Sequence, residues 1–227
     1  MDYERIVENV KGIPYTSPGR GKKLYDHVLR HRPKRILELG FAHGVSTCYL
    51  AAALDELGSG SVTTMDMASA RNREPNVEQL ATSLGLGDYI DPIYCESSFT
   101  WDLRSLLSDH SEPIFDLVFH DAGHTWDVAG YGFFLTDPLL RPGGWMLFDD
   151  LDWTLEGSRR MREKDWVRQL PDEQRTMAQV GQVYDLLVKR HRDYVEVARD
   201  EDGAWAWVRK RRPGPLGRRR VAKLPPY

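Results

Sequence analysis

The 227-residue sequence has only two cysteines and no long apolar run. Cys48 and Cys95 are too few for a disulfide framework, so a reducing compartment is expected. No segment approaches the ~18 consecutive apolar residues of a membrane span. The opening Met-Asp-Tyr-Glu-Arg also lacks the basic-then-apolar pattern of a signal peptide. We therefore expect a cytoplasmic protein with no membrane partner.

Acidic residues are missing from the last part of the sequence. Residues 209–227 contain eight Lys or Arg and no Asp or Glu, although the whole chain carries a net charge of −3. Prolines and glycines in this segment argue against a regular element. A basic arm of this kind can bind nucleic acid, but here no aromatic side chains for base stacking are interleaved with the charges. We interpret 209–227 as a solvated C-terminal extension and expect no nucleic-acid partner.

The remaining sequence can build a substantial core, since 41% of its residues are hydrophobic and 11% aromatic. Short apolar runs alternate with helical patterns, which predicts a parallel, doubly wound sheet. The predicted fold is α/β and Rossmann-like, with seven strands, mostly parallel, and an antiparallel C-terminal hairpin. The predicted strands are 36–39, 61–66, 90–94, 115–119, 145–148, 194–198 and 204–208, and the predicted helices are 22–30, 45–57, 76–84, 101–107, 126–140 and 176–191.

We divide the chain into an N-terminal segment, 1–34, a central domain, 35–208, and the basic extension. Tyr15 and Thr16 lie in a turn-rich part of the N-terminal segment. This part is either a plain loop or a piece of a substrate lid.

The segment from Arg35 to Ser46 organises the central domain. Its apolar strand breaks at Gly40, and small residues follow at Ala42 and Gly44 before a helix begins. Such a turn lets the backbone approach a ligand closely while helix N–H groups point at it. Glu38 lies two residues before the first glycine, where it would repel a pyrophosphate and attract a cationic ligand. The pattern therefore favours a nucleotide-like cofactor that carries positive charge.

Asp66 ends the second predicted strand, about twenty residues after the glycine loop. A carboxylate there can accept hydrogen bonds from both hydroxyls of a ribose, although an aspartate can also cap the following turn. Ser97 follows the third strand, where it or its neighbours could contact an adenine ring.

Three carboxylates follow two further strands. Asp121 ends the fourth strand, and Asp149 and Asp150 end the fifth. Carboxyl ends of adjacent parallel strands meet at one edge, so these groups would repel one another unless a cation such as Mg²⁺ neutralises them. The alternative is that one caps a helix and another is solvated. His124 lies within reach of the same edge, as a general base, a metal ligand or a helix cap.

These motifs resemble the metal-dependent class I S-adenosylmethionine (SAM) O-methyltransferases, above all the bacterial macrocin- and mycinamicin-type branch that modifies sugars and natural products. The similarity spans about Ile36 to Asp150 and rests on the following motifs: Glu38-Leu-Gly-Phe-Ala-His-Gly, Asp66, Asp121-Ala-Gly-His-Thr, Leu140-Arg-Pro-Gly-Gly and Asp149-Asp150. The chain is more distantly similar to catechol-type enzymes. In those enzymes a lysine stands at the place of His124 and an asparagine at that of Asp150.

The resemblance implies Mg²⁺-dependent methyl transfer from SAM to a hydroxyl of a small-molecule acceptor, with His124 and Asp121 as the catalytic residues. It implies Mg²⁺ ligation by Asp121, Asp149 and Asp150, and dimers are common enough in the fold to suggest a homodimer or higher homo-oligomer. The implied cofactor contacts come from Glu38, Gly40, Ala42, Gly44, Ser46, Asp66, Met67, Ser97 and Asp121. Two alternatives stay open, a cephalosporin-hydroxylase-like protein of the same fold and a nucleotide-binding module without chemistry.

The acceptor itself is not specified by these motifs. Four aromatic residues could line an acceptor pocket for a ring or a sugar, or could simply pack in the core or a lid; they are Trp126, Tyr131, Trp153 and Trp166.

Overall fold

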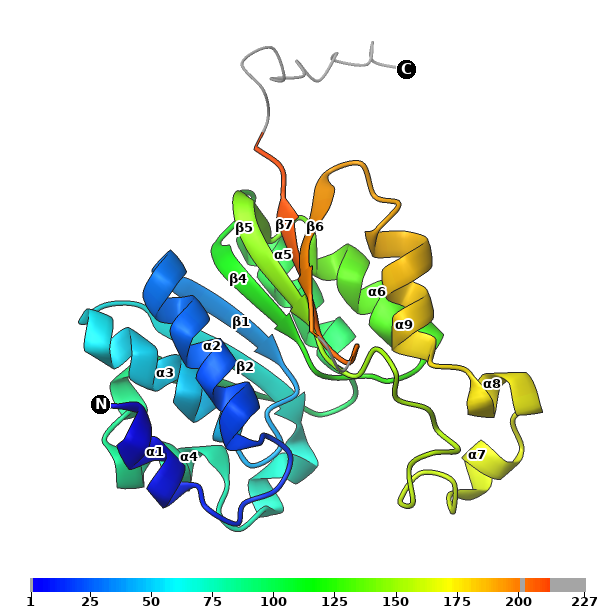
Figure 1. Ribbon diagram of the computed structural model, residues 1–227, viewed down its shortest axis with the longest axis horizontal. Coiled ribbons are helices and arrows are strands. Elements are labelled where there is room, and N and C mark those ends of the chain that lie inside the picture. The colour runs from blue at the N-terminus through cyan, green and yellow to red at the C-terminus, as the bar shows by residue number, and fades with distance from the viewer. Residues whose placement is uncertain (1, 201–202, 213–227) are drawn as a thin grey trace.

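The computed structural model describes residues 2–200 and 203–212, arranged as a central sheet with helices on both faces (Figure 1). Seven strands of the described residues form the sheet, in the order β3-β2-β1-β4-β5-β7-β6. The first five strands are parallel, and β7 pairs antiparallel with both β5 and β6. The strands are β1 (Arg35–Leu39), β2 (Ser61–Met67), β3 (Ile90–Cys95), β4 (Phe115–His120), β5 (Leu140–Phe148), β6 (Tyr194–Arg199) and β7 (Ala206–Lys210). The predicted fold class is confirmed.

Two helical layers bury the two faces of this sheet (Figure 1). One layer contains α1 (Tyr3–Asn9), α2 (Pro18–His31), α3 (Val45–Leu57) and α4 (Val77–Leu84). The other contains α5 (Phe99–Asp109), α6 (Trp126–Thr136), α9 (Gln179–Val183) and η3 (Tyr184–Val188), a π-helical turn that continues α9. The short elements α7 (Asp165–Arg168) and α8 (Asp172–Thr176) project beside the sheet, and two 3₁₀ turns are η1 (Ala68–Asn72) and η2 (Gly87–Tyr89).

The alternation of side chains along the strands explains why the core has an apolar cluster on each face of the sheet. Leu37 and Leu39 of β1 face one apolar cluster with α5 and α6, and Ile36 faces the other with α2 and α3. This alternation follows from the period of two along a strand. Pro92 is found in β3, which is an edge strand as predicted, because proline cannot donate a ladder hydrogen bond.

Several predicted boundaries were wrong. The predicted helix over 126–140 ends at Thr136, because the Leu139 carbonyl instead accepts from the start of β4 and Leu140 begins β5. The predicted single helix over 176–191 is replaced by α8, α9 and η3, with extended backbone at Met177. Strand β7 continues to Lys210, two residues into the predicted basic extension, and Arg211 and Arg212 follow in no regular element. Residues 213–227 of that prediction lie outside the described residues.

Helix α1 was not predicted, and a local cap accounts for it. The Asp2 side chain accepts a hydrogen bond from the backbone N–H of Arg5, and Ile6 is fully buried. Helix α2 begins earlier than predicted because Ser17 caps it and Pro18 occupies its first turn. No helix in the described part of the chain is both long and apolar enough to cross a membrane.

Candidate active site at the carboxyl edge of the sheet

A cavity of about 640 Å³ opens at the carboxyl ends of the parallel strands. This is where ligands bind in open α/β sheets. Its wall combines the loop after β1, the ends of β2, β4 and β5, the segment before α2 and the segment between β5 and α7. Eight of the predicted site residues line it, namely Gly40, Ala42, Ser46, Asp66, Asp121, His124, Asp149 and Asp150.

Asp66 fixes the shape of the glycine loop. Its Oδ2 accepts hydrogen bonds from the backbone N–H of Phe41 at 3.1 Å and of Ala42 at 2.7 Å, and its Oδ1 accepts from that of Met67 at 2.7 Å. Ala42 adopts a positive φ of 48°, which the two bonds help to hold. Asp66 therefore has a structural role in the loop while its side chain also lines the cavity.

Glu38 lies beneath the loop, fully buried and outside the cavity wall. Its Oε2 accepts hydrogen bonds from the hydroxyls of Thr47 at 2.5 Å and Thr64 at 2.6 Å. Burial raises the pKa of Glu38, and these hydroxyl bonds oppose that rise. The structure thus gives Glu38 a position that supports the loop from below, and its direct contact with a cofactor stays a prediction.

Three further predicted cofactor contacts also lie outside the cavity. Gly44, at φ +91°, packs against Val77, and a Cβ on it would come within 2.6 Å of that side chain. Met67 and Ser97 are exposed on the surface beyond the cavity. Their roles toward a cofactor stay predictions.

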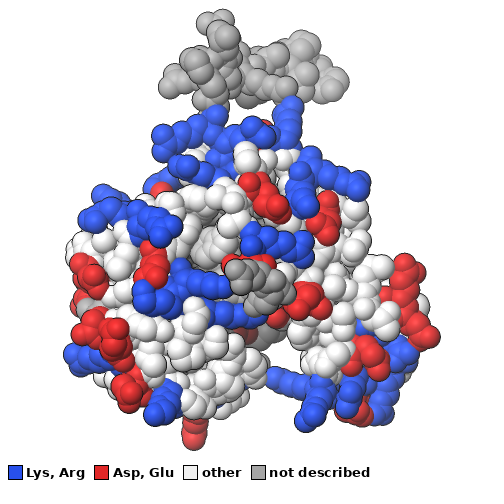
Figure 2. Space-filling view, viewed as in Figure 1, with Lys and Arg blue, Asp and Glu red and all other residues white. Residues whose placement is uncertain are grey.

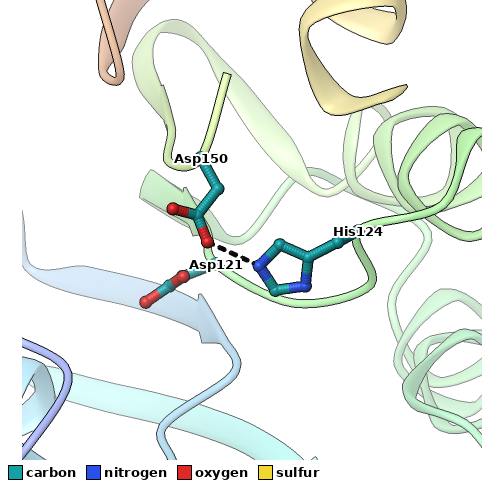
Figure 3. Close-up of side chains that lie close together, drawn as sticks. All are labelled: Asp121, His124 and Asp150. Atoms are coloured by element: carbon teal, nitrogen blue, oxygen red, sulfur yellow. Dashed lines mark hydrogen bonds and ion pairs between the residues drawn. The ribbon is translucent and has the colours of Figure 1, made fainter. Parts of the chain in front are cut away.

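The acidic edge brings Asp121, His124 and Asp150 together (Figure 3). One ligand atom of each lies within 4.8 Å of the others, close enough to share a metal ion. His124 Nε2 is 2.6 Å from Asp150 Oδ2, and its ring lies 4.6 Å from that of Trp153. Asp150 has a φ of 59°, an uncommon value for a residue with a side chain and one that often marks functional sites.

Asp149, the third predicted metal ligand, is buried and pairs with an arginine. It is 7% exposed, and its carboxylate accepts from Arg20 Nη1 at 3.0 and 3.3 Å. Burial and the neighbouring Asp150 raise the pKa of Asp149 to about 6, while Arg20 opposes the rise. The residues whose ligand atoms lie close enough to share an ion are Asp121, His124 and Asp150, and the metal-ligand role of Asp149 stays a prediction.

Asp121 lies where negative charge accumulates. Burial raises the pKa of Asp121 well above its usual value, and Asp149 and Asp150 raise it further. A cation is therefore electrostatically favoured beside this group.

The cavity contains residues that sequence reasoning missed. Arg20, Arg73 and Arg160 line it, although they lie far apart in the sequence and share no motif. Tyr15 and Thr16 also line it, and whether they belong to a lid or to a plain loop stays a prediction. The only available signal for Arg20 was its place in the turn-rich segment that precedes the first strand.

The four aromatic residues that could line an acceptor pocket do not all lie in one cavity wall. Trp153 and Trp166 line the main cavity, while Trp126 lines a neighbouring cavity of about 730 Å³ that shares Trp166 and Thr125. Tyr131 is 56% exposed and lies in neither wall.

Comparison with known proteins identifies the family of the chain and structures of similar fold. Residues 37–151, just over half of the chain, match a family model described as a methyltransferase domain. No curated protein matches the sequence.

Solved structures of similar fold include three methyltransferases. An O-methyltransferase from Bacillus cereus, in complex with SAH, is 21% identical over 91% of this chain and 88% of its own, with a TM-score of 0.62. TomG from Streptomyces achromogenes, an O-methyltransferase involved in tomaymycin synthesis and solved with SAM, is 20% identical over 92% and 89%, with a TM-score of 0.63. The SAH-bound methyltransferase PaMTH1 from Podospora anserina is 21% identical over 93% and 88%, with a TM-score of 0.64.

The matched residues run from β1 to the turn after β5, and so include both the glycine loop and the acidic edge. The chain belongs to the methyltransferase-domain family.

Proposed function

We propose that this protein transfers a methyl group from SAM to a hydroxyl oxygen of a small molecule, with the help of a divalent cation such as Mg²⁺. One observation carries the proposal: a single cavity joins the glycine loop and Asp66 to the group of Asp121, His124 and Asp150. The first part suits a nucleoside cofactor, and the second suits a cation beside an acceptor. The SAM and SAH complexes of the structural neighbours support the choice of cofactor.

Gly40, Ala42 and Ser46 would hold the methionine end of the cofactor, because they line the cavity at the start of α3. Asp66 would accept from the ribose hydroxyls with oxygen lone pairs that the loop N–H groups leave available.

The residues at the acidic edge fit a divalent cation. Asp121 and Asp150 offer carboxylate oxygens, and the pKa of Asp121 is raised first by burial and then by the negative charges of Asp149 and Asp150, which a cation would neutralise. When bound, Mg²⁺ would lower the pKa of an acceptor hydroxyl and SAM would supply an electrophilic methyl group. The ion pair with Arg20 engages Asp149, so we assign that carboxylate to holding the start of α2 rather than to the cation.

His124 would remove the acceptor proton. The contact with Asp150 orients the imidazole and places an Nε2–H toward the carboxylate, which leaves Nδ1 free to accept a proton. If His124 is a metal ligand instead of the base, its substitution should abolish metal binding.

The acceptor we propose is a sugar or an aromatic natural product. The Trp153 ring lies against His124, and Trp166 forms part of the same wall. Aromatic rings bind flat apolar faces and sugar rings well. The role of TomG in tomaymycin synthesis supports a natural-product acceptor.

Calorimetric titration tests the cofactor first. SAH should bind and NAD should not, whereas a preference for NAD or no binding of either would contradict the proposal. Mn²⁺ binding, followed by electron paramagnetic resonance, then tests the cation. His124→Gln should keep Mn²⁺ and SAH binding and lose turnover if His124 is the base, and should lose Mn²⁺ binding if it is a ligand. Asp121→Asn should lose Mn²⁺ binding, and full Mn²⁺ affinity in that variant would refute the metal site.

A further inference from the structure

Tyr15 lies between two guanidinium groups in the wall of the main cavity. Arg73 Nη1 donates a hydrogen bond to the Tyr15 hydroxyl at 3.4 Å, and the Arg73 guanidinium lies 5.3 Å from the centre of the Tyr15 ring. Arg160 approaches the same hydroxyl from the segment between β5 and α7. Both arginines lower the pKa of Tyr15. Three segments distant in the sequence therefore converge on one oxygen atom.

These two arginines differ from the other arginine of the cavity. Arg20 pairs with Asp149, whereas Arg73 and Arg160 form no ion pair with a carboxylate of the described residues. Two like charges near one neutral oxygen repel each other, although solvent weakens the repulsion because Tyr15 and Arg160 are exposed. A guanidinium group also offers a planar pair of donors that matches a carboxylate or a phosphate. An anion between the two guanidinium groups would offset their repulsion and accept hydrogen bonds from both.

The backbone supports this arrangement. Tyr15 has a φ of 89°, an uncommon value for a residue with a side chain, and its ring stacks on His43 at 6.0 Å between ring centres. The His43 ring is held in turn, with Nδ1 2.7 Å from the Pro75 carbonyl oxygen. In Figure 2, basic side chains border the gap between the α7–α8 region, at lower right, and the rest of the molecule.

We infer that Arg73 and Arg160 form an oxyanion subsite of the cavity, which binds a carboxylate or a phosphate group of a ligand. The group could belong to the acceptor or to the amino-acid end of the cofactor, and the chemistry of recognition is the same in both cases. The inference rests on the proposed function only in the case where the cofactor supplies the anionic group. It adds a substrate feature, an acidic group, that the acceptor pocket alone does not indicate.

The test uses the full chain and the double variant Arg73→Gln/Arg160→Gln. The matched control is Arg159→Gln, because Arg159 is exposed next to Arg160 but lies outside the cavity wall. Calorimetry compares SAH with 5′-methylthioadenosine, the same nucleoside thioether without the amino-acid part. A second titration adds inorganic pyrophosphate, with and without saturating SAH. Thermal unfolding of each variant confirms that it is folded.

If the cofactor supplies the anion, the double variant should bind SAH at least ten-fold more weakly and 5′-methylthioadenosine equally well. If the acceptor supplies it, SAH affinity should be unchanged, and pyrophosphate should bind the wild type but not the double variant. Arg159→Gln should match the wild type in both titrations. The inference is overturned if the double variant binds both SAH and pyrophosphate as the wild type does. Failure of SAH to bind even the wild type would instead count against the proposed function, and the pyrophosphate titration would still decide the subsite.

Discussion

Replacing Gly40 with alanine should damage the site, because there is no room for the added Cβ between the ends of β1 and β4. Gly40 has a φ of +90°, and a Cβ there would lie 2.2 Å from the backbone carbonyl oxygen of Asp121. The backbone of Asp121 is itself held, since its N–H donates to the Leu39 carbonyl at 2.9 Å. Neither the Gly40 Cα nor the Asp121 carbonyl oxygen can move away without disturbing the pairing of β1 with β4. The substitution therefore tests whether this close approach is required.

The expected loss combines two effects. A positive φ costs a residue with a side chain about 1–2 kcal/mol, and overpacking against fixed backbone costs about 1–3 kcal/mol. The free energy of unfolding should fall by roughly 2–5 kcal/mol, which for a chain of this size lowers Tm by about 5–15 °C. Urea unfolding followed by circular dichroism measures the first quantity, and calorimetric titration of SAH should show weaker binding as well.

Gly58→Ala provides the matched control. Gly58 also has a positive φ, +69°, at the end of α3, but a Cβ on it would meet open space in the described part of the chain. It should lose only the backbone cost, about 1–2 kcal/mol. If Gly40→Ala is as stable as Gly58→Ala and binds SAH equally well, then the close approach of the glycine loop to Asp121 does not exclude a side chain at position 40. That result would contradict this prediction.

Two further predictions concern buried polar groups. Thr64→Val removes one of the hydroxyl donors to buried Glu38 and should destabilise the fold by about 1–3 kcal/mol in urea; an unchanged midpoint would mean that this hydrogen bond does not stabilise the fold. Burial lowers the pKa of His27 to about 3, so the unfolded chain binds a proton near pH 6.5 that the folded chain does not. Stability should therefore fall as the pH drops from about 6.5 towards 3, by up to ~1.4 kcal/mol per pH unit. His27→Phe, which keeps a ring against Trp207, should reduce the loss between pH 7 and pH 5, and an identical loss in the variant would contradict the assignment.

The strands were predictable because parallel strands buried on both faces read as short apolar runs. Ile36 to Leu39 and Phe115 to Phe119 are such runs; Gly40 follows the first directly, and Asp121 follows the second after His120. These same runs define the sheet edge, so the loop after β1 and the acids after β4 and β5 could be placed together before any coordinates were known. Helix ends were less predictable because tertiary pairing decides them, as it does where Leu140 joins β5.

Pairings between distant segments were not predictable. Arg20 and Asp149 are 129 positions apart, and nothing in the sequence around either residue indicates that they meet. Arg73 and Arg160 likewise lie in irregular segments, which carry no periodic pattern from which a position in the cavity could be inferred. Only the folded chain shows that all three guanidinium groups reach one cavity.

The outcome at Asp149 and Asp150 has a simple geometric cause. Side chains of successive residues at the end of a strand point to opposite sides, so two consecutive acids rarely serve one ion unless the backbone turns between them. Here Asp150 adopts a φ of 59°, and its N–H donates to Asp149 Oδ1 at 2.6 Å, which closes a tight turn at the strand end. That turn directs Asp150 toward His124 and leaves Asp149 facing Arg20. The sequence therefore placed both acids at one edge of the sheet, while the backbone conformation of Asp150 decided which of the two meets His124.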